Sequence, residues 1–356
     1  MSGRKQHYIP QFLLRSFGEA GSGKKLQVRV FTSEQNFIVP TDGIATQRDF
    51  YSKFGGDVVS LDDRITYAEN EYFAIFSDLL ACPANSLPNS RDVARLLVHL
   101  GVRGNHLRGS AATACAYAMR RAGELLADES YLKRMMGIGQ VNPPASVRKM
   151  LDNVFNERRA MLQKASVSRH EFRRKMFAEL NEKSESLLSG NDFAFSELVG
   201  MIDVSEISRE AHNDVLAQGM ESEKRVEILD AMEWHIKDWE TPVFVLSDAI
   251  ALAHDADRAA MPAMFVGIDE LEGIIFPLSP TRAVCSGVYS DDTVLEALVS
   301  NFASFAARAS WEFVVAPPSY GNVAVDGALI GSGVGSLIYE SIEAAMAESL
   351  AESFNI

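Results

Sequence analysis

Hydrophobic and polar positions alternate in the first part of the chain. Residues 25–31 (KLQVRVF) place Leu26, Val28 and Val30 on one face, which is the period of a half-buried β-strand. Residues 37–41 (FIVPT) follow after a polar turn, so we expect them to pair with that first strand. The pattern predicts a strand-rich N-terminal region.

From residue 63 the pattern changes to the three- and four-residue spacing of amphipathic helices. Apolar residues at this spacing mark a first helix: Ile65, Ala68, Tyr72, Ile75, Phe76 and Leu79. A second helix is expected to begin near Ser90, because serine is a favoured N-cap. Further helices are predicted over residues 111–127, 145–165, 168–188 and 205–233.

After Trp234 the chain returns to short β-rich runs that end at proline or polar residues. These runs are 241–248 (TPVFVLSD), 273–280 (GIIFPLSP) and 312–318 (EFVVAPP). Between the last two, residues 294–309 predict a helix, and residues 336–354 predict another.

Strands at both ends of the chain and helices between them predict an α+β fold. Three or more strands are normally needed to bury one face of a sheet, and neither end has enough strands of its own. We therefore expect a small mixed sheet built from N- and C-terminal strands, with a large helical block inserted between them. The predicted regions are residues 1–62 (N-terminal strands), 63–233 (helices) and 234–356 (a C-terminal α/β region that forms one compact unit with 1–62).

Composition narrows the class of protein. The 356 residues are 47% hydrophobic, which is enough for a sizeable core. The first residues lack the apolar stretch of a secretory signal, and no apolar run reaches the ~18–20 residues of a membrane span. The three cysteines, Cys82, Cys115 and Cys285, have no ligand-like spacing. These features predict a cytoplasmic protein without a membrane segment.

Charge is distributed unevenly along the chain. The net charge is −14, yet residues 91–183 carry 18 Lys and Arg against 9 Asp and Glu, a balance of +9. Residues 234–356 carry 4 against 17, a balance of −13. One interpretation is that both regions are solvated or face each other. The other is that the basic region binds a polyanion, such as nucleic acid or another phosphate ligand.

The segment HYIPQF at residues 7–12 places a histidine close to the N-terminus. Pro10 suits the first turn of a helix, and Phe12 and Phe17 would then pack inward. In this reading the segment anchors the N-terminus to the core, with His7 as a hydrogen-bonded structural residue. In the alternative reading His7 is a metal ligand or a general base.

Glu69 and a basic stripe form the second candidate site. Glu69 shares a helical face with Phe73, Phe76 and Leu80, so its carboxylate is expected to be partly buried and to need a partner. The next predicted helix offers basic residues at spacings of four, four, four and three: Arg91, Arg95, His99, Arg103 and His106. The stripe predicts an anion-binding pocket beside a poised carboxylate. The alternative is a structural Glu–Arg pair between neighbouring helices.

Several segments together resemble one protein family. They are HYIPQFLLRSF (7–17), VRVF (28–31), GIATQRDFYS (43–52), RLLVHLGVRGNHLR (95–108), PVFVLSD (242–248), IIFPLSP (274–280) and SNFASFAARASWEFV (300–314). On these motifs the chain resembles the domain of unknown function 4238 family over nearly its whole length. The resemblance implies an intracellular, typically bacterial protein and brings no established reaction. Members usually continue the Ser–Asp pair with Asn–Pro, whereas Asp248 is here followed by Ala249 and Ile250.

Asp248 closes a strand-like segment, and strand ends often carry site residues. His7, Glu69 and Asp248 would together offer the ligand types of a divalent metal. We therefore expect an enzyme that acts on a phosphate-bearing substrate, for example a nuclease. Its catalytic residues would be His7, Glu69 and Asp248, and the basic stripe would be its anion site. The alternative is a non-catalytic binding or regulatory protein that uses its acidic C-terminal region as a partner surface.

Overall fold

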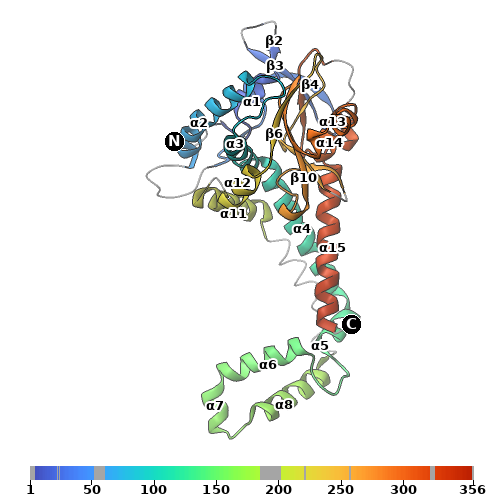
Figure 1. Ribbon diagram of the computed structural model, residues 1–356. Helices are drawn as coiled ribbons and strands as arrows, with labels where there is room; N and C mark the ends of the chain where they lie inside the picture. Colours follow the sequence, from blue (N-terminus) through green and yellow to red (C-terminus); the bar gives the residue numbers. More distant parts are fainter. Residues whose placement is uncertain are drawn as a thin grey trace. The chain divides into compact units, whose positions relative to one another are not determined.

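The computed structural model of the protein (Figure 1) describes residues 5–21, 23, 25–51, 61–184, 202–219, 222–255, 258–320 and 325–354. The chain folds into two compact units. The first comprises Met1–Ala112 and Ser205–Leu337, and the second comprises Thr113–Val204 and Ile338–Ile356. The prediction instead kept residues 63–233 together as one helical region. The structure divides that region, because its first and last helices bury their apolar faces in the core of the first unit.

N- and C-terminal strands share one sheet of the first unit, and the α+β class is confirmed. The strands of this sheet are β2 (Glu19–Ala20), β3 (Leu26–Phe31), β4 (Asn36–Pro40), β7 (Leu246–Ser247) and β12 (Val314–Ala316). β3 pairs with β4, β2 and β12, and β12 pairs in turn with β7. Every pair among the described strands is antiparallel, whereas the prediction was a mixed sheet. The register shows this directly, since Val314 faces Phe31 and Ala316 faces Arg29.

A second sheet is built entirely from residues 234–287. The order of its described strands is β6 (Trp234–Asp238), β11 (Arg282–Gly287), β10 (Leu271–Ser279), β8 (Leu252–Asp255) and β9 (Arg258–Pro262). The sequence predicted β10 and missed its neighbours. β11 is one reason, because Ala283–Ser286 are buried at successive positions and give no alternation of apolar and polar residues.

Helices and short elements complete the first unit. They are β1 (Lys5–His7), α1 (Gln11–Ser16), β5 (Thr46–Arg48), α2 (Leu61–Ala81), α3 (Ser90–Val102), the start of α4 (Asn105–Ala127), α11 (Val204–Gln218), α12 (Glu223–Asp230), α13 (Asp292–Val299), α14 (Phe302–Ala309) and the start of α15 (Ser332–Phe354). Short 3₁₀ turns lie at Thr41–Gly43, Ile268–Glu270, Val288–Ser290 and Gly327–Leu329. α1 and α2 contact β10, and α3 packs along α12. Within the described residues, no helix combines the length and the apolar composition that crossing a membrane requires.

The N-terminal segment is anchored to the core, as one reading of HYIPQF predicted. Pro10 precedes the first turn of α1, and its carbonyl accepts the N–H of Leu13 at 3.1 Å. Leu13 and Phe17 are fully buried. The ring of Phe12 packs against Phe76 of α2, with 5.0 Å between the ring centroids. Residues at the very start of the described chain therefore position α2.

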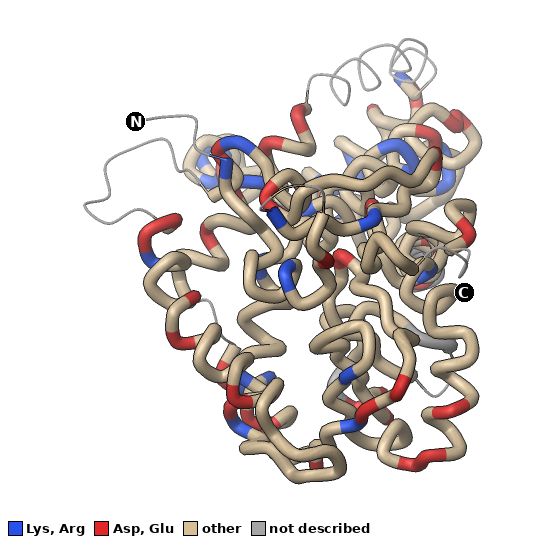
Figure 2. The backbone as a smooth tube through the Cα atoms, turned by 90° about the horizontal axis from the view of Figure 1, so that it is seen from above, with Lys and Arg blue, Asp and Glu red and all other residues tan. Residues whose placement is uncertain are grey.

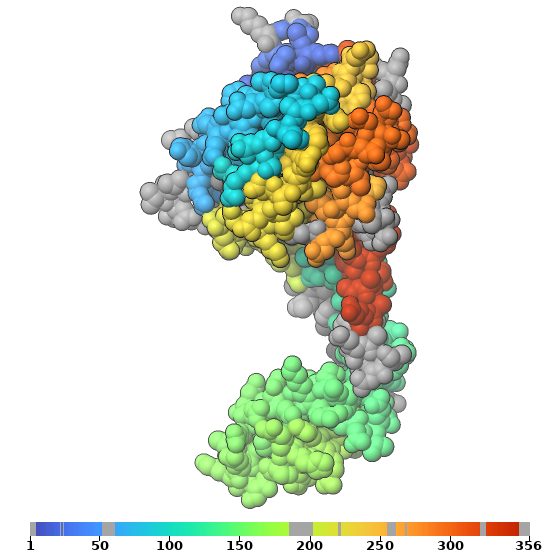
Figure 3. Space-filling view, viewed as in Figure 1, coloured from blue at the N-terminus to red at the C-terminus, as the bar shows by residue number. Residues whose placement is uncertain are grey.

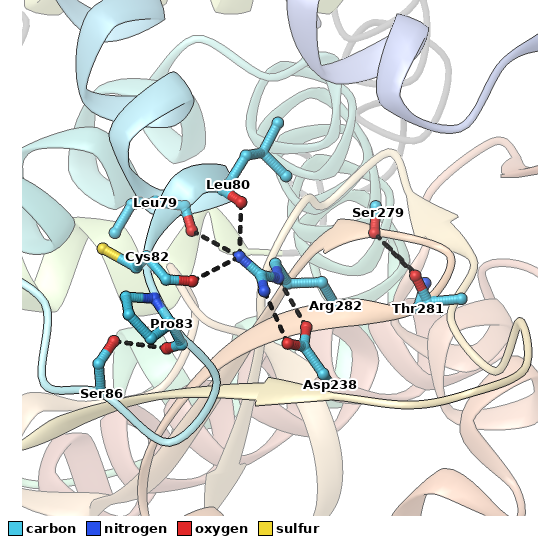
Figure 4. Close-up of polar contacts among 9 residues, drawn as sticks. All are labelled: Leu79, Leu80, Cys82, Pro83, Ser86, Asp238, Ser279, Thr281 and Arg282. Atoms are coloured by element: carbon cyan, nitrogen blue, oxygen red, sulfur yellow. Dashed lines mark hydrogen bonds and ion pairs between the residues drawn. The ribbon is translucent and has the colours of Figure 1, made fainter.

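The C-terminal end of α2 is also fixed, by an arginine of the second sheet. Arg282 donates to the carbonyl oxygens of Leu80 at 2.5 Å and Cys82 at 2.9 Å (Figure 4). Asp238 of β6 holds the same guanidinium through two bonds of 2.6 Å. A cation at a helix C-terminus satisfies the last carbonyl groups and interacts favourably with the helix dipole. The helix that carries Glu69 is thus held by Phe12 at Phe76 and by Arg282 at its C-terminal end.

The second unit is helical in its described part. It contains the remainder of α4, α5 (Glu129–Met136), α6 (Ala145–Glu157), α7 (Arg159–Lys164), α8 (Arg169–Glu182) and most of α15. The helix predicted over residues 145–165 is interrupted at Arg158, and residues 185–188 of the next predicted helix lie outside the described part. Within this unit, Glu343 of α15 accepts hydrogen bonds from Tyr117 at 2.5 Å and Arg121 at 2.6 Å.

Basic and acidic positions are interspersed along most of the chain drawn in Figure 2.

Candidate functional site

Arg103 is the centre of the candidate site. It directly follows α3, and its side chain is only 2% exposed. Its Nη1 lies 2.7 Å from Oε1 of Glu69, and its Nη2 donates to the carbonyl oxygen of His7 at 2.8 Å. Its Nε donates to the hydroxyl of Tyr51 at 3.2 Å. A buried guanidinium needs both a counter-charge and hydrogen-bond acceptors, and these three residues supply them.

Glu69 lies at the edge of this cluster. It extends from α2, whose buried face is formed by other residues: Leu61, Ile65, Tyr72, Phe76 and Leu79. The Glu69 side chain is 31% exposed. The predicted partial burial and the predicted need for a charged partner are both confirmed. Its second oxygen, Oε2, makes no hydrogen bond or ion pair to any described residue, and the partly exposed side chain leaves it able to bind a water molecule.

His7 stands at the end of β1 and is half-buried. The side-chain amide of Gln11 donates to its Nδ1 at 3.2 Å and also to the carbonyl of Thr41 at 2.8 Å. Burial lowers the pKa of the His7 imidazole, whereas Glu69 and the backbone of Ile44 oppose that shift. The ring is therefore neutral at pH 7, and the backbone of the same residue binds Arg103.

The middle of the predicted basic stripe is enclosed in protein. His99 is 1% exposed and stacks on Tyr72, with ring centroids 4.0 Å apart. Burial, together with Arg103 and Arg95, holds the pKa of His99 well below its usual value. Arg95 remains 27% exposed and pairs with Glu71 at 2.7 Å. The stripe thus presents two cations to solvent, Arg91 and Arg95, and each is paired with a carboxylate, Arg91 with Glu223 at 2.7 Å.

Asp248 lies in a different cluster. It follows β7, is fully buried, and accepts the backbone N–H groups of Trp311 and Glu312 at 2.7 Å each and of Phe313 at 3.4 Å. Burial raises the pKa of Asp248 to about 7, and the N–H groups of Trp311 and Glu312 oppose that shift. The carboxylate shapes the turn that leads into β12.

His106 belongs with Asp248 rather than with Arg103. The periodicity of the stripe ends at Val102, and α4 begins three residues later. Gly104 permits this turn, because a Cβ there would lie 2.3 Å from Nδ1 of His106. His106 is fully buried, and burial together with His212 lowers its pKa to about 3. The spacing of three between Arg103 and His106 was read across the end of a helix.

The structure therefore brings His7, Glu69, His99 and Arg103 together and places Asp248 and His106 elsewhere. Tyr8 connects the two clusters, since its ring packs on Phe50 and Phe313 with centroids 5.3 and 6.5 Å apart. No group of three or more His, Cys, Asp and Glu residues in the described chain could hold a metal ion. The ligand set expected from His7, Glu69 and Asp248 is not assembled.

Comparison with known proteins supplies a family. A family model described as "Protein of unknown function (DUF4238)" matches residues 5–294. The chain belongs to this family. No curated protein and no solved structure matches the chain. The matched range contains all the residues predicted for the site and ends before the turn that Asp248 supports.

Sequence reasoning missed three polar residues around the site of this DUF4238 protein. Tyr51 lies within one of the family motifs, and its backbone N–H donates to Gln6 at 2.7 Å. Arg108 stacks over Phe50 at 3.6 Å and donates to His212 at 3.2 Å. Tyr51 and Arg108 lie within family motifs, residues 43–52 and 95–108, and that position could have marked them as site residues. Nothing in the local sequence pattern marked His212.

Proposed function

We propose that this DUF4238 protein is an intracellular enzyme that hydrolyses phosphate esters, with nucleic acid as its substrate class and Glu69 as its general base. The observation that carries the proposal is a fully buried guanidinium paired with a carboxylate that solvent still reaches. Arg103 fixes Oε1 of Glu69 at 2.7 Å, and Oε2 is left without a partner among the described residues.

A carboxylate held in this way can take a proton from a water molecule as the water oxygen attacks phosphorus. The new P–O bond forms while the ester P–O bond breaks, and the proton then passes from Glu69 to the departing oxygen. Arg103 orients the carboxylate and, being 2% exposed, does not contact the substrate. Arg103 is therefore a positioning residue.

His7 and Asp248 take supporting roles in this proposal. His7 offers its carbonyl to Arg103, and its neutral ring receives the Gln11 amide. The first contact joins the N-terminal segment to the arginine that pairs with Glu69, and the second stabilises the N-terminal segment itself. Asp248 stabilises the turn at residues 311–313. The proposal thus concentrates the chemistry on Glu69, where three catalytic residues were expected.

Charge supports a phosphate-bearing substrate. Residues 91–183 carry 18 Lys and Arg against 9 Asp and Glu. Arg95 lies on α3, about two turns before Arg103, and keeps 27% of its side chain exposed. A guanidinium at that position can pair with a phosphate oxygen when the substrate displaces Glu71, since ion pairs between exposed groups are weak.

The test is hydrolysis by two matched variants. Glu69→Gln keeps an oxygen for Arg103 but cannot take a proton. Glu71→Gln, two residues later on the same helix, alters a carboxylate that is 55% exposed and serves as the control. Substrates are bis(p-nitrophenyl) phosphate and single- and double-stranded DNA and RNA, each with Mg²⁺, with Mn²⁺ and with EDTA. Loss of a general base should slow cleavage about 10²–10⁴-fold. Glu71→Gln should cleave at or above the parent rate, because it removes a carboxylate that competes with the substrate for Arg95.

Two results would overturn the proposal. One is the absence of cleavage of every substrate by the parent protein. The other is an equal rate for the two variants.

A further inference from the structure

The second unit contains a cavity that the proposed reaction does not use. It has a volume of about 870 Å³, within the ~300–1,000 Å³ typical of ligand pockets. Residues 139–143 line one side, and side chains of α6 and α8 line the rest. All of these residues lie in the second unit, whose helices α6, α7 and α8 form the light-green part of Figure 3.

The walls of the cavity are held in place. α6 and α8 share a small apolar core of Val147, Leu151 and Phe177. Asp152 of α6 and Arg173 of α8 are joined by two bonds of 2.5 Å. These contacts fix the distance between the two helices.

The loop that closes the cavity is fixed as well. The backbone N–H of Gly139 donates to the side chain of Asn181 at 2.6 Å. Gly137 ends α5 with φ +69°, and a Cβ there would lie 2.4 Å from Pro144. This position therefore requires glycine. The cavity is a preformed feature of the fold rather than a gap between mobile segments.

Positive charge gathers in this cavity. Arg148 of α6 and Arg174 of α8 are exposed, and neither makes a hydrogen bond or an ion pair with a described residue. Asp152 and Glu171 act on these two charges at longer range, and both carboxylates are already paired with other cations. His170 is exposed beside the two arginines. No acidic residue is among the described residues that line the cavity, so an anion would meet these cations directly.

Packing explains only one face of α8. Phe172, Phe177 and Leu180 pack on α6. Arg174 is exposed and takes no part in that packing, so its presence calls for another role. Phosphate recognition is the role for which arginine is best suited, since its planar guanidinium can bind two phosphate oxygens at once.

We propose that this cavity binds the phosphate of a nucleotide unit, with Arg148 and Arg174 as the phosphate ligands. Gln140 and Asn142, which are exposed on the loop, offer amide groups to the polar edge of a base. Nucleotide units occur free or within a nucleic acid strand, and the two sources share this chemistry. The site is separate from Glu69, so its binding does not depend on the proposed hydrolysis.

Binding is measured by fluorescence anisotropy with a labelled single-stranded RNA oligonucleotide and with unlabelled AMP as competitor. The protein is the full chain carrying Glu69→Gln, so that cleavage does not interfere. The test variant adds Arg148→Glu and Arg174→Glu. The control adds Lys175→Glu and Lys149→Glu, which change the charge equally on the same two helices at residues outside the cavity lining. Circular dichroism verifies that both retain their helices.

The proposal predicts that the test variant loses at least tenfold in affinity and that its dependence on salt weakens, because phosphate contacts are lost. The control variant should bind the RNA nearly as tightly as the Glu69→Gln protein with an unmodified cavity. Competition by AMP identifies a free nucleotide as sufficient, whereas binding of RNA without such competition identifies the strand. Absence of RNA and AMP binding at low salt, or an equal loss in test and control variants, would overturn the proposal. Absence of hydrolysis by the parent protein, with RNA binding intact, would count against the proposed function alone.

Discussion

Arg103→Met is the most informative single perturbation of the N-terminal cluster. It keeps an apolar stem in a site that is 2% exposed and removes the bonds to Glu69, the His7 carbonyl and the Tyr51 hydroxyl. Removing one partner of a buried charge pair typically costs about 3–5 kcal/mol. Glu69 is 31% exposed and can be solvated once its partner is gone, so we expect the lower end, about 3 kcal/mol.

Hydrogen exchange followed by mass spectrometry suits this prediction, because the chain has two units and a single unfolding curve would mix them. Peptides covering residues 5–17 and 61–81 report on the segments that Arg103 joins. A loss of about 3 kcal/mol corresponds to exchange roughly 100-fold faster in these peptides. Peptides from α6 and α8 in the second unit should be unchanged.

Arg95→Met is the matched control. Arg95 lies on the same helix but is 27% exposed and pairs with Glu71, which is 55% exposed. Such surface pairs contribute about 0–1 kcal/mol. If Arg103→Met and Arg95→Met accelerate exchange of residues 5–17 equally, then Arg103 does not anchor the N-terminal segment and the reasoning fails.

Two further predictions concern the second cluster of the first unit. Burial and His212 lower the pKa of His106 to about 3, against about 6.5 when unfolded, so the unfolded chain binds the proton first as pH falls. The contribution of the neutral, buried His106 ring to the free energy of unfolding is complete above pH 6.5. It is lost at about 1.4 kcal/mol per pH unit as the pH falls from 6.5 toward 3. His106→Gln should flatten this slope when stability is followed by hydrogen exchange of peptides from the first unit, and an unchanged slope would contradict the assignment. Asp248→Asn leaves a single acceptor oxygen for the N–H groups of residues 311–313 and should cost about 1–3 kcal/mol in the same assay. A variant as stable as the parent would show that the carboxylate does not support that turn.

The sequence predicted elements whose pattern is local. β3 alternates through Val28 and Val30 and is followed by a polar turn, and the apolar spacing of α2 and α3 is regular. The joining of N- and C-terminal strands followed from counting strands, because neither end could bury a sheet face alone. β6, β8, β9 and β11 were missed. β11 is buried at successive positions and lacks a distinguishing period, whereas β6 does alternate, with Trp234 and Ile236 buried, and was overlooked.

The candidate site was predictable only as far as the helix faces allowed. Arg103 and His99 were placed correctly on one face of α3, but their burial depends on Tyr51, Tyr72 and His7, which are distant in sequence. Glu69 was the exception, because an ion pair between neighbouring helices was one of two readings. Asp248 was assigned from its position at a strand end, and its actual partners lie 63 to 65 residues later.

The boundary between the two units could not be read from composition. It falls inside α4 and α15, at residues 112–113 and 337–338, where the helical pattern continues without interruption, and at the start of α11, at residues 204–205. A helix that passes from one core to another keeps its period. A change of packing partner therefore leaves no local signal.

The site and the proposed reaction both depend on the claim that Arg103 holds the Glu69 carboxylate. A double-mutant cycle measures that interaction directly, using the parent, Glu69→Gln, Arg103→Met and the combined variant, with hydrogen exchange of residues 61–81 as the readout. The observed ion pair predicts a coupling free energy of about 1–3 kcal/mol between the two positions. Additive effects, with a coupling below about 0.3 kcal/mol, would contradict it.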